Sequence, residues 1–391
     1  MSDNHPAERK AWMTGKFQEL FKQPPTLWFR APGRVDLMGS HTDYNQGHVM
    51  TMTIDRDTWL AARPRSDRQV AIYSLNVPGG GAFSLDPVEH DTQTRWTNYV
   101  RGVAWSLQSG GSPPLRGFDG LIHSTIPFGS GLSSSAALEM STLAAFQHIN
   151  HLNLDPVSLA LAGQKAENQF VGVQSGILDQ YSSIMGQACR GLLLDCRSLT
   201  SRSVPIPDYL KVVICDTRAE RNLAGTEYGE RRAQCEEGAR ILKQFYPSIQ
   251  TLRDVTPDML QAHRSDLPPA TAKRCQFIVE EDQRVLDLAE ALPAGDTARL
   301  NALLSASYEG ARDLYEISAP CMEAMMAAML CGPGIVGARQ AGAGFGGCMV
   351  ALVESGCVAG FSRHVCEDYQ RRTGITPQVF AVEASPGAGL I

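Results

Sequence analysis

Three glycine-rich blocks constrain this chain more than any other feature, because each one interrupts a pattern of short apolar runs and longer helical segments. The middle block, residues 127–137 (PFGSGLSSSAA), lies between a strand-like run and a helical pattern. Glycines let a backbone approach a polyanion, and the free N–H groups at a helix start attract one. The block is predicted to be either a phosphate cradle or a glycine-rich turn with serine N-caps, and spacing alone leaves both open. It is not a Walker loop, because no Gly-Lys-Ser/Thr follows.

The last block, residues 342–347 (GAGFGG), formally matches the dinucleotide-binding pattern G-x-G-x-x-G. A dinucleotide loop leads from a strand into a helix, whereas these glycines lead into the strand-like run 348–353. The block therefore predicts a tight turn whose residues need positive φ.

The first block, residues 33–47, gathers polar side chains that could hold a polyol, although alone it would be interpreted as a solvated loop. Asp179 follows a glycine in apolar surroundings. Beside an arginine, such a carboxylate is a candidate general base or, taken singly, a structural salt bridge.

The length of 391 residues predicts two domains. The stretch 191–207, between helical and new strand-like segments, is the candidate boundary, which gives domains of 1–190 and 191–375. The predicted strands cover 26–31, 35–39, 48–54, 120–126, 192–194, 212–214, 348–353 and 379–382. The predicted helices cover 96–107, 134–149, 156–172, 226–245, 274–292, 298–314 and 321–330.

The charge composition of the chain indicates which kinds of binding partner to expect. The chain has 41 acidic and 35 basic residues, a net charge of −6, and no Lys/Arg run at either end, so neither nucleic acid nor an anionic membrane is expected as a partner. A polar start and the lack of a long apolar stretch predict a cytosolic protein. The ten cysteines include no C-x-x-C pair and the nine histidines no H-E-x-x-H motif, so buried free thiols and no transition-metal site are expected.

Taken together, the three blocks resemble those of the GHMP small-molecule kinases, and specifically of the galactokinases. Residues 31–45 (APGRVDLMGSHTDYN) resemble the galactokinase sugar loop, 129–137 the ATP loop and 337–348 the third motif, in family order. Segments 96–103, 167–173 and 227–236 agree as well. The resemblance implies a two-domain α+β GHMP kinase fold, with a ribosomal-protein-like N-terminal domain against which 376–391 packs, and a GHMP C-terminal domain. No oligomeric state follows, and a monomer is favoured.

The resemblance also implies roles for individual residues in a kinase that uses ATP and Mg²⁺. Asp179 matches the aspartate that orients and deprotonates the anomeric hydroxyl of the sugar, and Arg34 matches its charged neighbour. Ser135 and Glu167 match the Mg²⁺ ligands. The implied sugar contacts are Ser40, His41, Asp43, Gly176 and Tyr228, and the implied ATP contacts are Trp96, Tyr99, Gly129, Ser130, Gly131, Leu132, Ser133, Ser134 and Ser135.

The chain departs from the galactokinase pattern at four positions. Ser40 stands where galactokinases carry a Glu that holds the outer sugar hydroxyls, Asp36 where Asn is usual, Thr51 in place of Pro, and His48 in place of an apolar residue. Galacturonate kinases also have a small residue at the place of Ser40, and arabinose kinases combine a small residue with Asp. The alternatives are therefore galactose with neutral drift, galacturonate, or L-arabinose. If Ser40 sets specificity, a Ser40→Glu change should raise kcat/KM for galactose, and His48 or Arg30 could counter an acidic sugar. An inactive galactose and ATP sensor is the alternative of another class.

Overall fold

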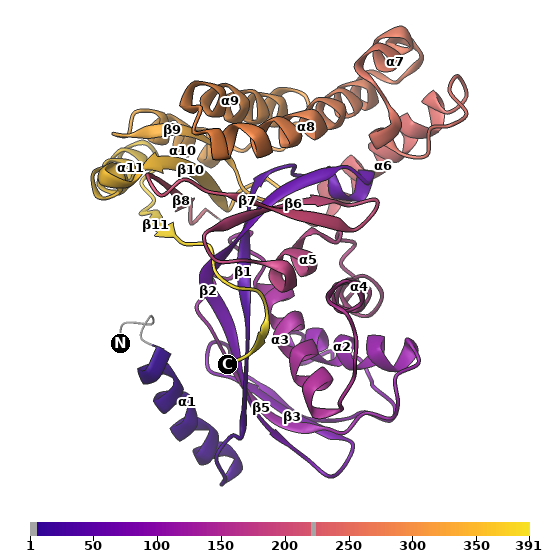
Figure 1. Ribbon diagram of the computed structural model, residues 1–391, viewed down its shortest axis with the longest axis vertical. Coiled ribbons are helices and arrows are strands. Elements are labelled where there is room, and N and C mark those ends of the chain that lie inside the picture. Colours follow the sequence, from indigo (N-terminus) through magenta and orange to yellow (C-terminus); the bar gives the residue numbers. More distant parts are fainter. Residues whose placement is uncertain (1–5, 220–223) are drawn as a thin grey trace.

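Two β-sheets form the frame of the computed structural model, which describes residues 6–219 and 224–391 (Figure 1). The eight-stranded sheet contains β1 (Leu27–Met38), β2 (His48–Pro64), β3 (Gln69–Ser74), β4 (Gly80–Ser84), β5 (Phe118–Ser124), β6 (Arg190–Asp195), β7 (Thr200–Pro205) and β12 (Gly389–Leu390). Its order is β12-β1-β2-β5-β3-β4, and β6 pairs with both β2 and β7. The four-stranded sheet runs β11-β8-β10-β9 and contains β8 (Leu210–Asp216), β9 (Ile335–Gln340), β10 (Cys348–Glu354) and β11 (Gln378–Val382).

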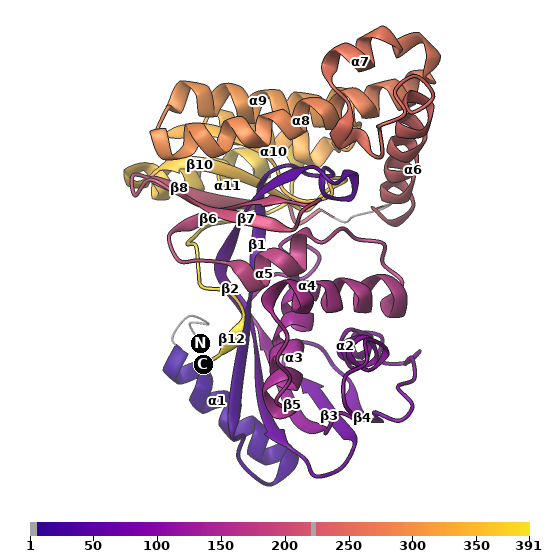
Figure 2. The same cartoon turned by 45° about the vertical axis from the view of Figure 1, so that its right-hand side comes forward.

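Helices cover both sheets. The α-helices in the described ranges are α1 (Pro6–Phe21), α2 (Thr97–Ser109), α3 (Ser134–Ile149), α4 (Pro156–Lys165), α5 (Leu178–Met185), α6 (Ala224–Leu242), α7 (Pro257–Ala262), α8 (Pro269–Ala294), α9 (Thr297–Asp313), α10 (Pro320–Leu330) and α11 (Val358–Thr373). Helices α2 to α5 lie on one side of the β1–β2 ribbon and α1 on the other (Figures 1 and 2). Helices α9, α10 and α11 contact the smaller sheet, while α8 contacts α9 and also reaches β1, β2 and β7. Helix α8 therefore joins the two sheets, and the predicted α+β class is confirmed.

The helical pattern predicted over 134–149 agrees with the structure residue for residue, because α3 covers the same range. The predicted helix over 156–172 is α4 followed by one π-helical turn, Ala166–Val171. The two predicted strands over 26–31 and 35–39 are one strand, β1, because irregularities in its register with β2 absorb the Pro32-Gly33 interruption without ending the pairing. Helices α1, α5, α7 and α11 have no counterpart among the predicted helices.

The sheets divide the chain differently from the expected boundary after residue 190. Strands β6 and β7 pair within the larger sheet, through the register His48↔Asp195 between β2 and β6. The change from one sheet to the other therefore falls between β7 and β8. The C-terminal segment is shared, because β11 pairs with β8 whereas β12 pairs with β1. Residues 1–5, on which the expectation of a polar start depends, lie outside the described residues.

None of the helices within the described ranges is long and apolar enough to span a lipid bilayer.

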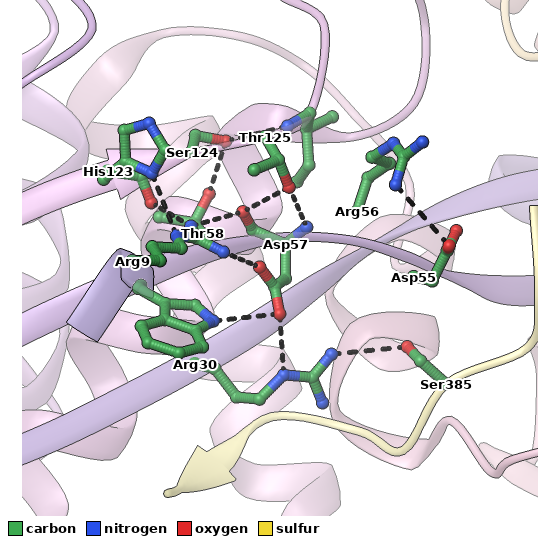
Figure 3. A network of polar contacts seen from close by, with 12 residues as sticks. Arg9, Arg30, Asp55, Arg56, Asp57, Thr58, His123, Ser124, Thr125 and Ser385 are labelled. Carbon is green, nitrogen blue, oxygen red and sulfur yellow. Dashed lines mark hydrogen bonds and ion pairs between the residues drawn. The ribbon is translucent and has the colours of Figure 1, made fainter. Parts of the chain in front are cut away.

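A buried polar cluster fastens both ends of the chain to the larger sheet (Figure 3). Asp57 on β2 accepts hydrogen bonds from Arg9 Nη1 at 2.5 Å and from Arg30 Nε at 2.9 Å, and its side chain is 13% exposed. Arg9 belongs to α1, and Arg30 donates its Nη1 hydrogen to the carbonyl of Pro386 at 2.8 Å. The carboxylate of Asp57 thus pairs with two guanidinium groups that hold α1 and the C-terminal segment in place.

We expect Asp57→Asn to lower the free energy of unfolding by about 3 kcal/mol, because it removes a largely buried negative charge that both Arg9 and Arg30 contact. Urea titration followed by circular dichroism measures the change. Glu19→Gln, which breaks an exposed Lys16–Glu19 pair on α1, is the matched control and should have little effect. Equal stability of Asp57→Asn and wild type would contradict the prediction.

Candidate active site

All three glycine-rich blocks meet around one cavity of about 560 Å³. Its walls combine Arg34, Asp36, Ser40, His41 and Asp43 of the first block, Gly129, Gly131, Ser133, Ser134 and Ser135 of the middle block, and Gly342 and Ala343 of the last. The predicted residues Glu167, Gly176, Asp179 and Tyr228 complete the lining together with Gly172, Val173, Gln174, Ser175, Leu178 and Gly229. Segments more than 300 residues apart in the chain therefore face the same space.

The middle block has the backbone geometry of an anion cradle. Gly129, Gly131 and Ser133 have φ of 70°, 86° and 60°, and α3 begins at the next residue, Ser134. The Ser133 side chain does not cap α3, and its hydroxyl is buried without a partner. The first N–H groups of an α-helix have no partner within the helix, so this uncapped end presents donors and the positive end of the helix dipole. The geometry favours the phosphate cradle over the capped turn.

The last block is a turn, as predicted, and it packs against the middle block. It joins the antiparallel strands β9 and β10, and its four glycines, at 342, 344, 346 and 347, all have positive φ. The N–H of Cys348 donates to the carbonyl of Ser130 at 3.1 Å. A Cβ on Gly342 would lie 3.4 Å from the carbonyl oxygen of Gly131. That distance is an ordinary van der Waals contact, so the positive φ of these residues, and not a lack of space at Gly342, is what favours glycine in this turn.

Arg34 connects the candidate base to the cradle. Its Nη2 donates a hydrogen bond to Asp179 Oδ1, and its Nη1 donates to the carbonyl of Gly131 at 2.6 Å. Arg34 is 6% exposed, and Asp179 stands in the first turn of α5. One rigid, planar cation thus holds a carboxylate and the phosphate cradle at a set spacing, which a more flexible Lys would not do.

Asp43 and Gly176 are brought into direct contact. A Cβ on Gly176 would lie 1.8 Å from Asp43 Oδ2, so only a glycine leaves room for this carboxylate. Burial, together with the nearby charges of Asp179 and Asp36, raises the pKa of Asp43 to about 6. Both positions are predicted sugar contacts, and the absence of a side chain at Gly176 is what allows the Asp43 carboxylate to lie against it.

His41 lines the cavity, but both of its nitrogens are already used. Nε2 lies 3.1 Å from the carbonyl of Ala343, and Nδ1 lies 2.9 Å from the hydroxyl of Tyr44. A carbonyl only accepts, so Nε2 carries the hydrogen and Nδ1 accepts from Tyr44. Burial lowers the pKa of His41 to about 4, which makes it a neutral ring packed 5.1 Å from the ring of Tyr228. We therefore expect His41 to shape the wall rather than to bind a ligand through its nitrogens.

The two residues expected to hold Mg²⁺ lie close together. Ser135 is on the first turn of α3, and its hydroxyl helps to lower the pKa of Glu167, although burial raises that pKa overall. Glu167 sits on the π-helical turn, a feature often found at functional sites. Among the described residues, no three His, Cys, Asp or Glu side chains form a metal cluster. A hydroxyl and one carboxylate are hard oxygen donors that fit a Mg²⁺ ion held mainly by phosphates and water.

Sequence reasoning missed Glu139 and Gln180. The Gln180 amide nitrogen donates to Glu139 Oε2 at 2.8 Å and to Glu167 Oε2 at 2.9 Å. Both residues are completely buried. Glu139 follows Ser135 by one turn of α3, so the two side chains lie on the same face of that helix. Gln180 follows Asp179 directly. Both positions could have been proposed from the sequence as neighbours of the predicted site residues Ser135 and Asp179.

The expected adenine contacts lie away from the cavity lining. Trp96 packs against the apolar core of the larger sheet, and its buried indole N–H has no partner. Burial, with a smaller contribution from Glu167, raises the pKa of Tyr99 to about 12. Ser130 and Leu132 are also outside the lining, and both are almost completely buried.

Comparison with known proteins gives consistent matches. A galactokinase galactose-binding signature matches residues 15–64, and a GHMP kinase N-terminal domain model matches residues 98–187. The chain is 44% identical over 382 residues to the galactokinase of Roseiflexus sp. (strain RS-1), covering 97% of each protein. It is 44% identical over 375 residues to that of Chloroflexus aggregans (strain MD-66 / DSM 9485), covering 96% of each.

Solved structures agree. The crystal structure of Lactococcus lactis galactokinase complexed with galactose superposes with a TM-score of 0.92 at 34% identity, over 97% of this chain and 98% of that one. A mevalonate kinase structure, at 16% identity and a TM-score of 0.63 over 92% of this chain and 100% of that one, shares the fold.

We expect Glu139→Gln to stabilise the fold more at high pH than at low pH. Burial, and next Glu167, raises the pKa of Glu139 well above its usual value. A carboxyl with a raised pKa gives stability that is complete below its unfolded pKa, 4.5, and is lost as pH rises toward the folded pKa. Gln has no such loss, so the difference in unfolding free energy between variant and wild type should widen with pH.

Urea unfolding at about pH 5 and about pH 8 measures this difference. Glu236→Gln, at an exposed carboxylate of α6, is the matched control and should show no such widening. A difference that stays the same at both pH values would contradict the prediction for Glu139.

Proposed function

The chain belongs to the galactokinase family of GHMP kinases, and on that premise we propose that it transfers the γ-phosphoryl group of ATP to the anomeric (C1) hydroxyl of galactose or of a sugar with the galactose ring configuration. Family membership makes it a phosphotransferase that uses ATP and an alcohol acceptor. The observation that carries the finer proposal is the Arg34–Asp179 pair, which joins a carboxylate in the cavity directly to the phosphate cradle.

The chemistry needs little beyond positioning and charge. The Asp179 carboxylate accepts the proton of the anomeric hydroxyl as the sugar oxygen bonds to the γ-phosphorus, and the bond from that phosphorus to the β–γ bridging oxygen breaks. The products are a sugar 1-phosphate and ADP, and the proton remains on Asp179. Arg34, with its Nη1 on Gly131 and its Nη2 on Asp179, lies where negative charge on the transferred group would be stabilised.

The uncapped start of α3 supports ATP binding at this end of the cavity. Its free N–H groups and the unpartnered hydroxyl of Ser133 are the donors that a triphosphate would satisfy. Ser135 and Glu167 would hold Mg²⁺, which supplies charge neutralisation for the phosphates when it is bound. Gln180 keeps the Glu167 carboxylate oriented by a hydrogen bond of 2.9 Å.

The sugar would lie at the other end of the same cavity. Asp43 supplies acceptor oxygens, and Gly176 leaves the space that this carboxylate occupies. Tyr228 closes the wall against His41 with an aromatic surface that suits the apolar face of a sugar ring. An acidic acceptor beside an aromatic wall is a typical arrangement for recognising a neutral polyol.

We expect Asp179→Ala to lower kcat for sugar phosphorylation by about 10²- to 10⁴-fold, because it removes the proton acceptor. ATP binding, measured by calorimetry, should be nearly unchanged. Asp258→Ala, at an exposed position on α7, is the control and should keep full activity. Unchanged phosphorylation by Asp179→Ala would overturn the assigned role.

We expect galactose binding to weaken as pH falls through about 6, the raised pKa of Asp43. Above that pH Asp43 is ionised and accepts hydrogen bonds through both oxygens, whereas below it one oxygen carries a proton. Calorimetric titrations between about pH 5 and pH 8 should show this step in wild type. Asp43→Asn should bind weakly at every pH and lack the step, and a step retained in that variant would show that another group causes it.

A further inference from the structure

A chain of hydrogen bonds runs from His41 on the cavity wall into the protein interior. The Tyr44 hydroxyl lies 2.9 Å from His41 Nδ1 and 2.6 Å from the hydroxyl of Tyr315. That second hydroxyl lies 3.2 Å from Cys235 Sγ. Tyr315 and Cys235 are completely buried, and of the four residues only His41 belongs to the described lining of the cavity. The proposed chemistry gives the other three no role.

The carbonyl of Ala343 fixes the direction of every hydrogen in this chain. Because His41 Nε2 donates to that carbonyl, the neutral ring accepts at Nδ1 and Tyr44 donates there. A tyrosine hydroxyl has one hydrogen, so the Tyr44 oxygen accepts from Tyr315. Tyr315 then has no hydrogen left and accepts from the Cys235 thiol. Removing either hydroxyl therefore leaves a buried group without its partner.

The backbone around Tyr315 is fastened by two buried arginines. Arg231 on α6 donates from Nε to the carbonyl of Tyr315 at 2.8 Å and from Nη2 to the carbonyl of Glu316 at 3.1 Å. Arg274 on α8 donates to the carbonyl of Leu314. Helices α6 and α8 thus hold the segment that follows α9, and the ring of Tyr315 has a fixed position between them.

Helix α6 turns towards Tyr315 the same face that carries a residue of the cavity wall. Tyr228, Arg231 and Cys235 are spaced i, i+3 and i+7, which places them on one side of an α-helix. Arg231 bonds to the Tyr315 carbonyl and Cys235 to its hydroxyl. Tyr228 lines the cavity, and its ring centroid lies 5.1 Å from that of His41. The contacts of Tyr315 therefore set where α6 holds the Tyr228 ring.

We propose that Tyr315 is a positioning residue for the sugar end of the cavity, because it holds two walls of that end at once. Through Tyr44 it satisfies Nδ1 of His41, and through α6 it holds Tyr228. The ring centroids of Tyr315 and His41 are 4.9 Å apart, so the two rings also pack directly. The inference rests on the proposed function, since it takes the sugar to lie beside His41 and Tyr228.

The hydrogen-bond chain is separate from the bonds that join the base to the phosphate cradle. The side-chain hydrogen bonds described for Tyr44 and Tyr315 go to His41, to Cys235 and to each other. Arg34 instead bonds to Asp179 and to the carbonyl of Gly131. A defect in the chain should therefore weaken sugar binding and leave ATP binding unchanged, whereas a general loss of stability would affect both.

The test removes single hydroxyl groups and measures kcat and the KM values for galactose and ATP by ADP release. The variants are Tyr315→Phe, Tyr44→Phe and the double variant. Tyr369→Phe is the matched control, because Tyr369 is also completely buried and donates to the carbonyl of Thr217 at 3.0 Å, but lies on α11 outside the described cavity lining. Circular dichroism and urea unfolding monitor folding and stability.

We expect Tyr315→Phe and Tyr44→Phe each to raise the KM for galactose about 3- to 10-fold, the change expected for one lost hydrogen bond, with the KM for ATP unchanged. The double variant should bind galactose about as weakly as the weaker single variant, because both changes break the same chain, whereas independent defects would multiply. Tyr369→Phe should lower stability and leave both KM values unchanged.

Cys235 allows a conservative rescue. Cys235→Ser keeps a donor at the same place and should keep the KM for galactose near that of wild type, whereas Cys235→Ala removes the donor and should raise it. In the Tyr315→Phe background the two substitutions should give the same KM, because the oxygen that accepts from position 235 is gone.

Nitrogen NMR of histidine-labelled protein tests the link to His41 without relying on activity. In wild type, Nε2 should give the signal of a protonated nitrogen and Nδ1 that of an acceptor in a hydrogen bond, and the signals missing from His41→Gln identify this ring. Tyr44→Phe should move the Nδ1 signal to that of a free acceptor. Tyr315→Phe should move it less, and Tyr369→Phe should not move it.

The inference is overturned if Tyr315→Phe leaves the KM for galactose unchanged, or raises the KM for ATP equally. Unchanged His41 signals in Tyr44→Phe would also overturn it. If Tyr315→Phe does not fold, Tyr44→Phe and the two Cys235 variants decide by the same criteria. Failure of the proposed function looks different, because wild type would then phosphorylate no sugar while the His41 signals still report the hydrogen-bond chain.

Discussion

The antiparallel pairing of β1 with β2 is the interaction on which the rest of the structure depends. Strand β2 is long enough to pair with β6 through its first residues and with β5 through its last ones, so it connects the parts of the larger sheet. Helix α8 packs on the same ribbon and brings the smaller sheet with it. The loop between the two strands carries Ser40, His41 and Asp43, whose positions are therefore set by the register of the ribbon.

Arg34, on strand β1 of this ribbon, connects three elements of the candidate active site. The strand presents the guanidinium to Asp179 on α5 and to the carbonyl of Gly131 in the cradle, so three elements share one cation. The turn between β9 and β10 approaches the same cradle and holds His41 through the carbonyl of Ala343. Because rigid elements hold these groups, the electrostatic environment is arranged before any ligand binds, which is how phosphoryl-transfer enzymes reach their rates.

Two clusters of buried charged side chains pair arginines with carboxylates. Asp57 pairs with two arginines that fasten α1 and the C-terminal segment, and Arg339 and Arg284 face Asp36 and Glu281 next to the cavity. Unpaired buried charges would be costly, so each network limits what can be substituted within it. Ser40 Oγ donates to Asp36 and accepts from Arg339 at 3.0 Å, so positions 36 and 40 cannot be understood one at a time, although they are separate departures from the family pattern in the sequence.

The sequence by itself determined the three glycine-rich blocks, the helix over 134–149 and the family. These features depend on local chemistry: positive φ, helical periodicity and the donors of a helix start. Only the tertiary structure decided that β1 is one strand, that β6 and β7 belong to the larger sheet, and that His41 has no free nitrogen. It also decided that Glu139 and Gln180 support the site and that Tyr315 connects Tyr44 with α6. Such facts depend on strand register and on contacts between residues far apart in the chain, which local pattern does not encode.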